Sequence, residues 1–320
     1  MALDDATADL VARTRASWGR PLHEMSLEQA RELCQPAAAT ASPAGRAARV
    51  TCAGGALQAR VYLPAGEPRA VMVFFHAGGW ALGGLRESAA LSGVLALRTR
   101  CVVVAVGYRC APEYRFPTAV QDAWTALEWA AGHREEIAGA QVPLIVAGEG
   151  AGGNLAAVIA RWSFERGGPA VDAQVLICPV TDSDTGSLSY LDASNQLLVD
   201  RDAMIWFWDM YAPDAAARKH PDASPLQAMF LTGSPPAVVL TAEHDVVRDE
   251  GELYAMRLVQ AGVPVEHRRF AGQPHGFAGM MDGQGRAEAL DFITAALDRG
   301  MGQRGAAGNP PRRSGLPGAS

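Results

Sequence analysis

The sequence predicts an α/β fold with a mainly parallel central sheet flanked by helices. Three observations lead to this prediction. Short apolar runs recur along the chain without strict alternation, which is typical of strands buried on both faces. Helical stretches separate these runs, as in other α/β proteins. The chain has 320 residues, 49% of them hydrophobic, which is enough for one large core with a small appended region.

The predicted elements follow one another in a regular order. Residues 1–45 have a helical and partly amphipathic pattern, and Ser26 and Gln29 are spaced as in a capping box. We expect these helices to lie over the core. The predicted strands are the runs ARVYLP, AVMVFF, CVVVAV, PLIVAG, AQVLIC, PAVVLTA and VEHRRF. The predicted helices cover residues 117–132, 151–165, 248–261 and 285–299.

One segment, residues 183–225, interrupts this alternation. It contains AMIWFWDMYAPD, whose large aromatic side chains suit either ordinary helix packing or an insertion that roofs a substrate pocket. We therefore predict N-terminal cap helices at 1–45, followed by an α/β domain at 46–300 that includes a cap insertion at 183–225. A tail rich in Gly, Pro and Arg follows at 301–320 and is predicted to be disordered.

Composition and charge argue against several classes of function. The net charge is −6 and no block of like charges is present, so nucleic acid is not an expected partner. The sequence has no window of about 18 uninterrupted apolar residues, and it begins with the acidic stretch MALDDATADL. We therefore expect a cytoplasmic protein without membrane association. The five cysteines lack C-x-x-C spacing, so we expect reduced thiols and no metal.

Four short segments carry groups suited to acyl chemistry. In HAGGW, glycines at a strand end let backbone N–H groups approach a substrate oxygen. Asp245 follows one predicted strand and His275 follows the next, and a histidine held by a buried carboxylate is kept in one tautomer and can act as a general base. The turn at 148–152 matches the nucleophile elbow G-x-S-x-G, except that Gly150 stands at the serine position.

Together with YRCAPEYRFPTAVQDA at 108–123, these motifs resemble the hormone-sensitive-lipase-like (bacterial family IV) carboxylesterases over roughly residues 20–300. That family has the α/β-hydrolase fold. FFHAGGW is similar to its H-G-G-G-W motif, TAEHDVVRDEG to its acid loop and GQPHGF to its histidine loop. The resemblance implies an oxyanion hole formed by the N–H groups of Gly78, Gly79 and Ala151, and no cofactor. It also implies a family tendency to form homodimers.

Five positions depart from the family pattern: Ala77, Gly107, Glu149, Gly150 and Val246. Glycine adopts the strained elbow conformation at little cost, so the fold should tolerate Gly150. An acyl-enzyme on this residue is impossible, and loss of a triad nucleophile costs about six powers of ten in kcat.

Other residues offer little replacement for the missing hydroxyl. Glu149 is a candidate accessory group. Ser163 lies more than three helical turns beyond the elbow, and Cys178 has no evident route to His275.

The remaining groups suit two chemistries. In the first, His275 removes a proton α to a carbonyl whose oxygen lies in the oxyanion hole, and elimination, dehydration or cyclisation follows. In the second, His275 activates a water for direct attack on an ester. The first needs no nucleophile, so we predict a lyase-like enzyme acting on a small acyl or carbonyl substrate, which would suit bacterial secondary metabolism. The alternatives are an esterase, either weakly active or inactivated by engineering, and a non-catalytic protein that binds a small ligand.

Overall fold

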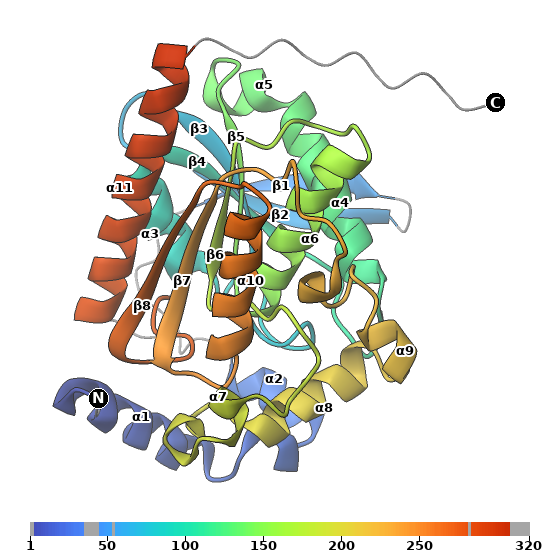
Figure 1. Cartoon of the computed structure of the whole chain (residues 1–320), viewed down its shortest axis with the longest axis vertical. Helices are drawn as coiled ribbons and strands as arrows, with labels where there is room; N and C mark the ends of the chain where they lie inside the picture. The colour runs from blue at the N-terminus through green and yellow to red at the C-terminus, as the bar shows by residue number, and fades with distance from the viewer. Residues whose placement is uncertain (1–2, 35–44, 53–54, 281–282, 308–320) are drawn as a thin grey trace.

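A computed structural model describes residues 3–34, 45–52, 55–280 and 283–307. Its centre is an eight-stranded sheet of order β1-β2-β4-β3-β5-β6-β7-β8. The six strands from β3 to β8 run parallel, whereas β2 pairs antiparallel with both β1 and β4. The predicted fold class, a mainly parallel sheet flanked by helices, is confirmed (Figure 1).

The strands are β1 (Arg46–Cys52), β2 (Gly55–Tyr62), β3 (Ala70–Phe75), β4 (Cys101–Gly107), β5 (Leu144–Glu149), β6 (Ala173–Ile177), β7 (Ala237–His244) and β8 (Val265–Pro274). The α-helices are α1 (Asp5–Trp18), α2 (Leu27–Leu33), α3 (Ala89–Thr99), α4 (Thr118–Gly132), α5 (Arg134–Ala138), α6 (Ala151–Glu165), α7 (Leu188–Leu191), α8 (Arg201–Tyr211), α9 (Ala215–Arg218), α10 (Arg248–Gln260) and α11 (Gln284–Ala307). Three short 3-10 helices complete the set: η1 (Leu22–Glu24), η2 (Ala193–Asn195) and η3 (Pro225–Gln227).

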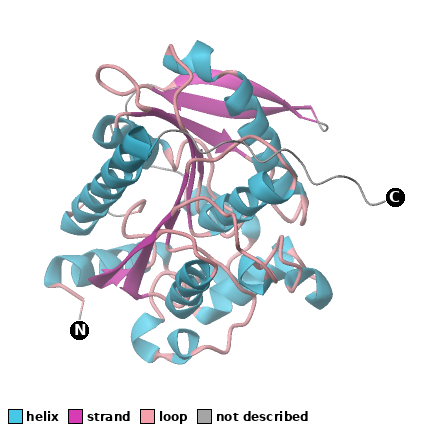
Figure 2. Cartoon of the chain, turned by 45° about the horizontal axis from the view of Figure 1, so that its top comes forward, coloured by secondary structure: helices cyan, strands magenta, loops and turns pink. Residues whose placement is uncertain are grey.

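Helices cover both faces of the sheet (Figure 2). Strand β3 shows how one apolar run serves both layers. Val71 and Val73 belong to the core beneath α4, α6 and α10, whereas Met72 and Phe74 belong to the core beneath α3 and α11. All six residues of β3 are buried. The unbroken hydrophobicity of the central runs therefore reflects burial on two sides.

Strand β1 and helix α3 are absent from the sequence prediction, as is the short helix α5. Strand β1 has the sequence RAARVTC, which contains no apolar run, and it pairs only with β2 at the edge of the sheet. Helix α3 is buried along most of its length, so its sequence lacks the polar face that marks an amphipathic helix.

A helical cap lies over the carboxyl ends of the parallel strands. It is formed by α1, η1 and α2 from the N-terminal segment and by the elements from α7 to η3, as Figure 1 shows beneath β7 and β8. Ser26 and Gln29 form the predicted capping box at the start of α2. At the other end of the chain, α11 continues to Ala307, beyond the predicted end of the helix at residue 299. Residues 308–320 of the predicted tail lie outside the described residues.

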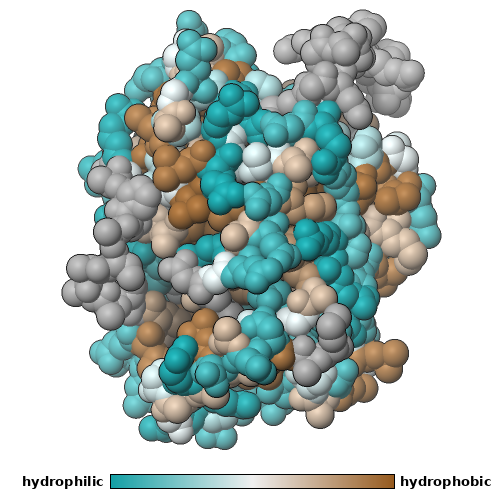
Figure 3. Space-filling model, turned by 90° about the vertical axis from the view of Figure 1, so that its left-hand side faces the viewer, coloured by the Kyte–Doolittle hydropathy of each residue, from teal (hydrophilic) through white to brown (hydrophobic). Residues whose placement is uncertain are grey.

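Hydrophilic and hydrophobic residues are mixed on the side of the molecule that carries α11 (Figure 3). No helix in the described part of the chain is both long and apolar enough to cross a membrane. The cytoplasmic location and the homodimer stay predictions.

Candidate functional site

The elbow, residues 148–152, turns the chain from the end of β5 into α6. Gly150 has φ 55° and ψ −115°, a conformation that residues with side chains rarely adopt. Its N–H donates to the carbonyl oxygen of Ile177 at 2.9 Å, and its carbonyl oxygen accepts the N–H of Val180 at 3.2 Å. Because these are backbone hydrogen bonds, they do not depend on the side chain at position 150.

Position 150 differs from its neighbours in the room that it leaves for a side chain. A Cβ on Gly148 would lie 2.1 Å from the carbonyl oxygen of Gly152, and a Cβ on Gly152 would lie 2.0 Å from that of Phe75. Only glycine fits at these two positions. A Cβ on Gly150 would instead lie 3.4 Å from Nε2 of His275, which is an ordinary contact distance. A side chain at position 150 would therefore fit and would face the imidazole.

The dyad is formed by Asp245, directly after β7, and His275, directly after β8. Nδ1 of His275 lies 2.8 Å from Oδ2 of Asp245, and Oδ1 of Asp245 accepts the N–H of Val247 at 3.0 Å. Burial lowers the pKa of His275, but the charge and hydrogen bond of Asp245, with the charge of Glu149, outweigh it and leave the pKa raised. The structure thus brings together two residues that are thirty positions apart in the sequence.

The glycine loop, residues 76–83, approaches the same space from the end of β3. Gly78 and Gly79 have φ of 116° and 57°, and the Gly78 carbonyl oxygen accepts the N–H of Leu82 at 2.8 Å. Within the described part of the chain, the N–H groups of Gly78, Gly79 and Ala151 donate no hydrogen bond. Ala151 also begins α6, where the helix dipole favours negative charge. These three N–H groups are therefore available to a ligand oxygen.

His76 fixes the base of the glycine loop. Its ring stacks on Tyr108 with centroids 4.1 Å apart, and its Nδ1 lies 2.7 Å from the carbonyl oxygen of Ala77. Burial lowers the pKa of His76 to about 4, so the ring is neutral and Nδ1 can donate this hydrogen bond. Tyr108 in turn donates to the carbonyl oxygen of His76 at 3.0 Å.

The aromatic residues of α8 cover the glycine loop. Trp80 stacks on Tyr211 with centroids 4.2 Å apart and lies 4.7 Å from Trp208. A Cβ on Gly79 would lie 2.2 Å from the ring of Phe207, so that ring rests directly on the glycine. The aromatic insertion therefore packs as a helix and also roofs this part of the site.

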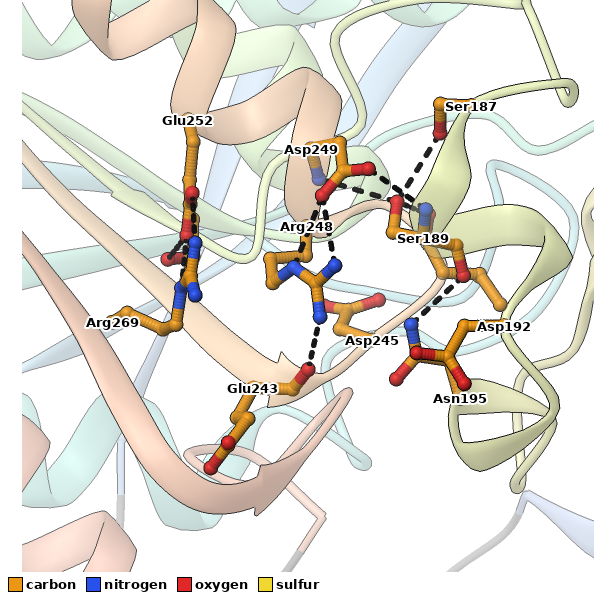
Figure 4. Close-up of polar contacts among 12 residues, drawn as sticks. Ser187, Ser189, Asp192, Asn195, Glu243, Asp245, Arg248, Asp249, Glu252 and Arg269 are labelled. Carbon is orange, nitrogen blue, oxygen red and sulfur yellow. Dashed lines mark hydrogen bonds and ion pairs between the residues drawn. The ribbon is translucent and has the colours of Figure 1, made fainter. Parts of the chain in front are cut away.

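The cap is also tied to the acid loop, residues 245–249 (Figure 4). Ser189, in α7, donates its Oγ hydrogen to the carbonyl oxygen of Val246 at 2.7 Å, and its N–H donates to Asp249 at 2.7 Å. Arg248 donates to the carbonyl oxygen of Glu243 at 2.8 Å and pairs with Asp249. This network, which the sequence did not suggest, holds the backbone on either side of Asp245.

Glu149 supports the histidine loop, residues 274–279. It is 4% exposed, and its Oε1 accepts the N–H of Gly279 at 2.9 Å. Burial raises the pKa of this carboxyl group. Glu149 therefore braces the loop that carries His275.

The sequence interpretation of Cys178 was wrong. Its Sγ lies within 4.8 Å of the ligand atoms of both Asp245 and His275. The reason is topological, because β6 and β7 are neighbours and their carboxyl ends lie side by side. Ser163, by contrast, donates to the carbonyl oxygen of Ala160 within α6.

Cysteine, aspartate and histidine are the ligand types of zinc sites. Here, however, Nδ1 of His275 is already hydrogen-bonded to Asp245, and a metal at that atom would lie on the opposite side of the ring from Nε2 and Gly150. The dyad hydrogen bond therefore occupies the ring atom that a metal would need, and we interpret these residues as a dyad with a neighbouring thiol.

The sheet, the elbow and the dyad at the carboxyl ends of the strands place the protein in the class of α/β hydrolases. The profile of the family described as alpha/beta hydrolase fold matches residues 72–279. Carboxylesterase NlhH of Mycobacterium tuberculosis is 36% identical over 248 residues, which cover 76% of this chain and 78% of that protein. An ethyl acetate hydrolase of Pseudomonas putida is 33% identical over 274 residues, 81% of this chain and 86% of that protein.

A solved structure shows the same similarity. The hyperthermophilic esterase of the archaeon Pyrobaculum calidifontis superposes with a TM-score of 0.83 at 33% identity, covering 93% of this chain and 99% of that one. The chain belongs to the hormone-sensitive-lipase-like esterase family of α/β hydrolases, as its motifs predicted.

Proposed function

We propose that the protein hydrolyses small esters without a nucleophilic serine, with His275 as the general base for an attacking water. One observation carries this proposal: Nε2 of His275 faces the open space above Gly150, 3.4 Å from the position of a Cβ. In the family pattern this space belongs to the nucleophile. The preference for hydrolysis over the lyase-like reaction comes from the relatives, which are named as a carboxylesterase and an ethyl acetate hydrolase.

Each step of the proposed reaction uses a group described above. The N–H groups of Gly78, Gly79 and Ala151 bind the ester carbonyl oxygen and stabilise the negative charge that develops on it. Nε2 of His275 takes a proton from the water as its oxygen bonds to the carbonyl carbon. The tetrahedral intermediate then expels the alkoxide, which receives that proton, and acid and alcohol leave. Asp245 fixes the tautomer of His275 and stabilises the imidazolium.

The cap favours a small acyl group in this proposal. Phe207 is only 3% exposed and rests on Gly79, one of the proposed oxyanion donors. A bulky acyl chain beside that donor would have to displace the aromatic ring. Short esters are therefore the proposed substrate class.

Elimination is the second candidate, and the atoms nearest to a Cβ at position 150 favour it. The three atoms nearest to the Cβ position are Nε2 of His275, Cε1 of the same ring and Cβ of Ala77. Two of the three are carbon, whereas a buried water usually makes about three hydrogen bonds. A substrate C–H next to a carbonyl needs only the base. In this reaction His275 takes the α proton, the oxyanion donors hold the enolate, and a leaving group departs from the β carbon with the electron pair.

Product analysis separates the two reactions. The purified protein is incubated with p-nitrophenyl acetate and with a β-acetoxy ketone, and the products are identified by mass spectrometry. Acetate and p-nitrophenol, formed without a protein adduct of 42 Da, support hydrolysis. An α,β-unsaturated ketone from the second compound supports elimination. If neither product forms above the rate seen with His275→Ala, both proposals fail and a ligand-binding protein is the better account.

A further inference from the structure

Cys178 occupies a conformationally constrained position next to the dyad. It follows β6, and its φ of 43° lies in the left-handed region that residues with a Cβ seldom adopt. Its N–H donates to the carbonyl oxygen of Leu240 in β7 at 2.8 Å, while the preceding carbonyl, of Ile177, accepts the N–H of Gly150. The backbone of Cys178 is therefore fixed between the elbow and the strand that carries the acid. Strain of this kind concentrates at functional sites.

The thiol of Cys178 lies among the groups that determine the charge of the dyad. Its Sγ is within 4.8 Å of Asp245 and His275, and the residue is 1% exposed. Burial, followed by the charges of Asp245 and Glu149, raises the pKa of the thiol well above its ordinary value. The thiol therefore stays protonated and can act only as a weak S–H donor.

Asp245 has an acceptor site left for this donor. Its Oδ1 accepts the N–H of Val247 and its Oδ2 accepts from His275. A carboxylate offers about four lone-pair sites, so these two hydrogen bonds leave capacity for a third partner. We propose that Cys178 is a positioning residue whose S–H donates to Asp245 and thereby sets the basicity of His275. This inference deepens the proposed function, because it concerns the base of the same site.

The physical reason is the sharing of charge. A donor to Asp245 draws negative charge away from the side of the carboxylate that faces His275, which weakens its support of the imidazolium. A thiol is a weaker donor than a hydroxyl, so Cys178 leaves Asp245 a strong partner of the base. Besides Asp245, the described residues whose charge acts on His275 are Glu149 of β5 and, through Glu149, Arg286 of α11. They stay unchanged when Cys178 is substituted.

A pair of substitutions tests the proposal without any need for turnover. Alanine and serine are both smaller than cysteine and differ from each other by one hydroxyl. We expect the pKa of His275, measured by NMR titration with His275→Gln for assignment, to follow the order Cys178→Ala, parent, Cys178→Ser from highest to lowest. The pKa of His275 should differ by about half a unit between successive proteins in this order. Cys101→Ser is the matched control: this buried thiol begins β4, at the opposite end of the parallel strands, and its substitution should leave the pKa unchanged.

Two results would overturn the proposal: the same pKa in all variants, or the same shift in the alanine and serine variants, which would indicate loss of packing alone. If a variant does not fold, the parent still provides a test. The ¹³Cβ chemical shift of Cys178 should then change with pH, with the same midpoint as the titration of His275. A shift that does not change with pH would contradict the proposal. The two proposals can fail separately. If the pKa values follow the expected order but no turnover depends on His275, this inference is supported and the proposed function fails.

Discussion

The elbow and the dyad face each other, but the elbow keeps only the backbone conformation of a catalytic position, whereas the dyad keeps its side chains. At the elbow, Gly150 keeps the strained backbone of a nucleophile position without a side chain. At the dyad, both side chains are present and 2.8 Å apart, with Asp245 buried and the ring of His275 12% exposed. The difference shows what holds each region in place. Backbone hydrogen bonds and glycine contacts fix the elbow. The dyad depends on side-chain hydrogen bonds: its own, and those of Ser189, Arg248 and Glu149 to the loops that carry it. The site geometry can therefore persist although one reactive group is absent.

The largest expected effect comes from giving the elbow a side chain. We expect Gly150→Ser to raise ester hydrolysis by up to about six powers of ten, because its Oγ would face Nε2 of His275 and could form an acyl-enzyme. The positive φ should lower the free energy of unfolding by about 1–3 kcal/mol. Burst kinetics with p-nitrophenyl acetate measure the gain.

Gly150→Ala is the control for this change. It introduces the same backbone strain and a methyl group without the hydroxyl, and it should show neither burst nor gain. If the serine variant folds but hydrolyses the ester no faster than the alanine variant, a hydroxyl at position 150 is not activated by His275, and the elbow is not a usable nucleophile position.

Breaking the dyad should have the next largest effect. Asp245→Asn keeps the size of the side chain and an oxygen for the N–H of Val247, but it removes the charge and can favour the wrong tautomer of His275. We expect the His275-dependent rate to fall by about four powers of ten. Circular dichroism serves to check the fold of the variant. A well-folded variant with the parental rate would show that Asp245 does not assist the base.

The contact between the cap and the glycine loop should have a moderate effect on stability. Gly79→Ala places a Cβ 2.2 Å from the ring of Phe207, and overpacking of this kind costs about 1–3 kcal/mol. Gly66→Ala is the matched control, since its φ is also positive, at 90°, but no atom lies within 4 Å of the new Cβ. Chemical denaturation compares the two variants. Equal losses of stability would mean that only the backbone strain matters and that the ring of Phe207 moves aside at no cost in free energy.

The smallest expected effect is a displaced pH profile. The base must be neutral to accept a proton, and the pKa of His275 is raised, so kcat/KM should fall on the acidic side with a midpoint above about 6.5, the ordinary value. The raised pKa of His275 also makes stability depend on pH. Its contribution to the free energy of unfolding is complete below the unfolded-state pKa of His275 and is lost as the pH rises through the folded-state pKa. A midpoint clearly below the ordinary value would mean that burial outweighs Asp245.

The sequence predicted the central strands well because burial on both faces leaves an unbroken apolar run, as in β3. It also indicated the residues that the structure gathers around Gly150, since each follows a strand in a parallel sheet. It missed contacts that depend on strand order and cap placement. Cys178 lies beside Asp245 because β6 and β7 are neighbours, and Ser189 reaches the acid loop across the cap interface. Neither contact has a local sequence pattern.

We expect the imidazole of His275 to act as a base in the space above Gly150 without a serine. The most direct measurement compares kcat/KM of the parent and of His275→Ala on p-nitrophenyl acetate, with both proteins purified identically. A base at His275 predicts a parental rate above background that falls to background in the variant. Equal rates in the two proteins would contradict it.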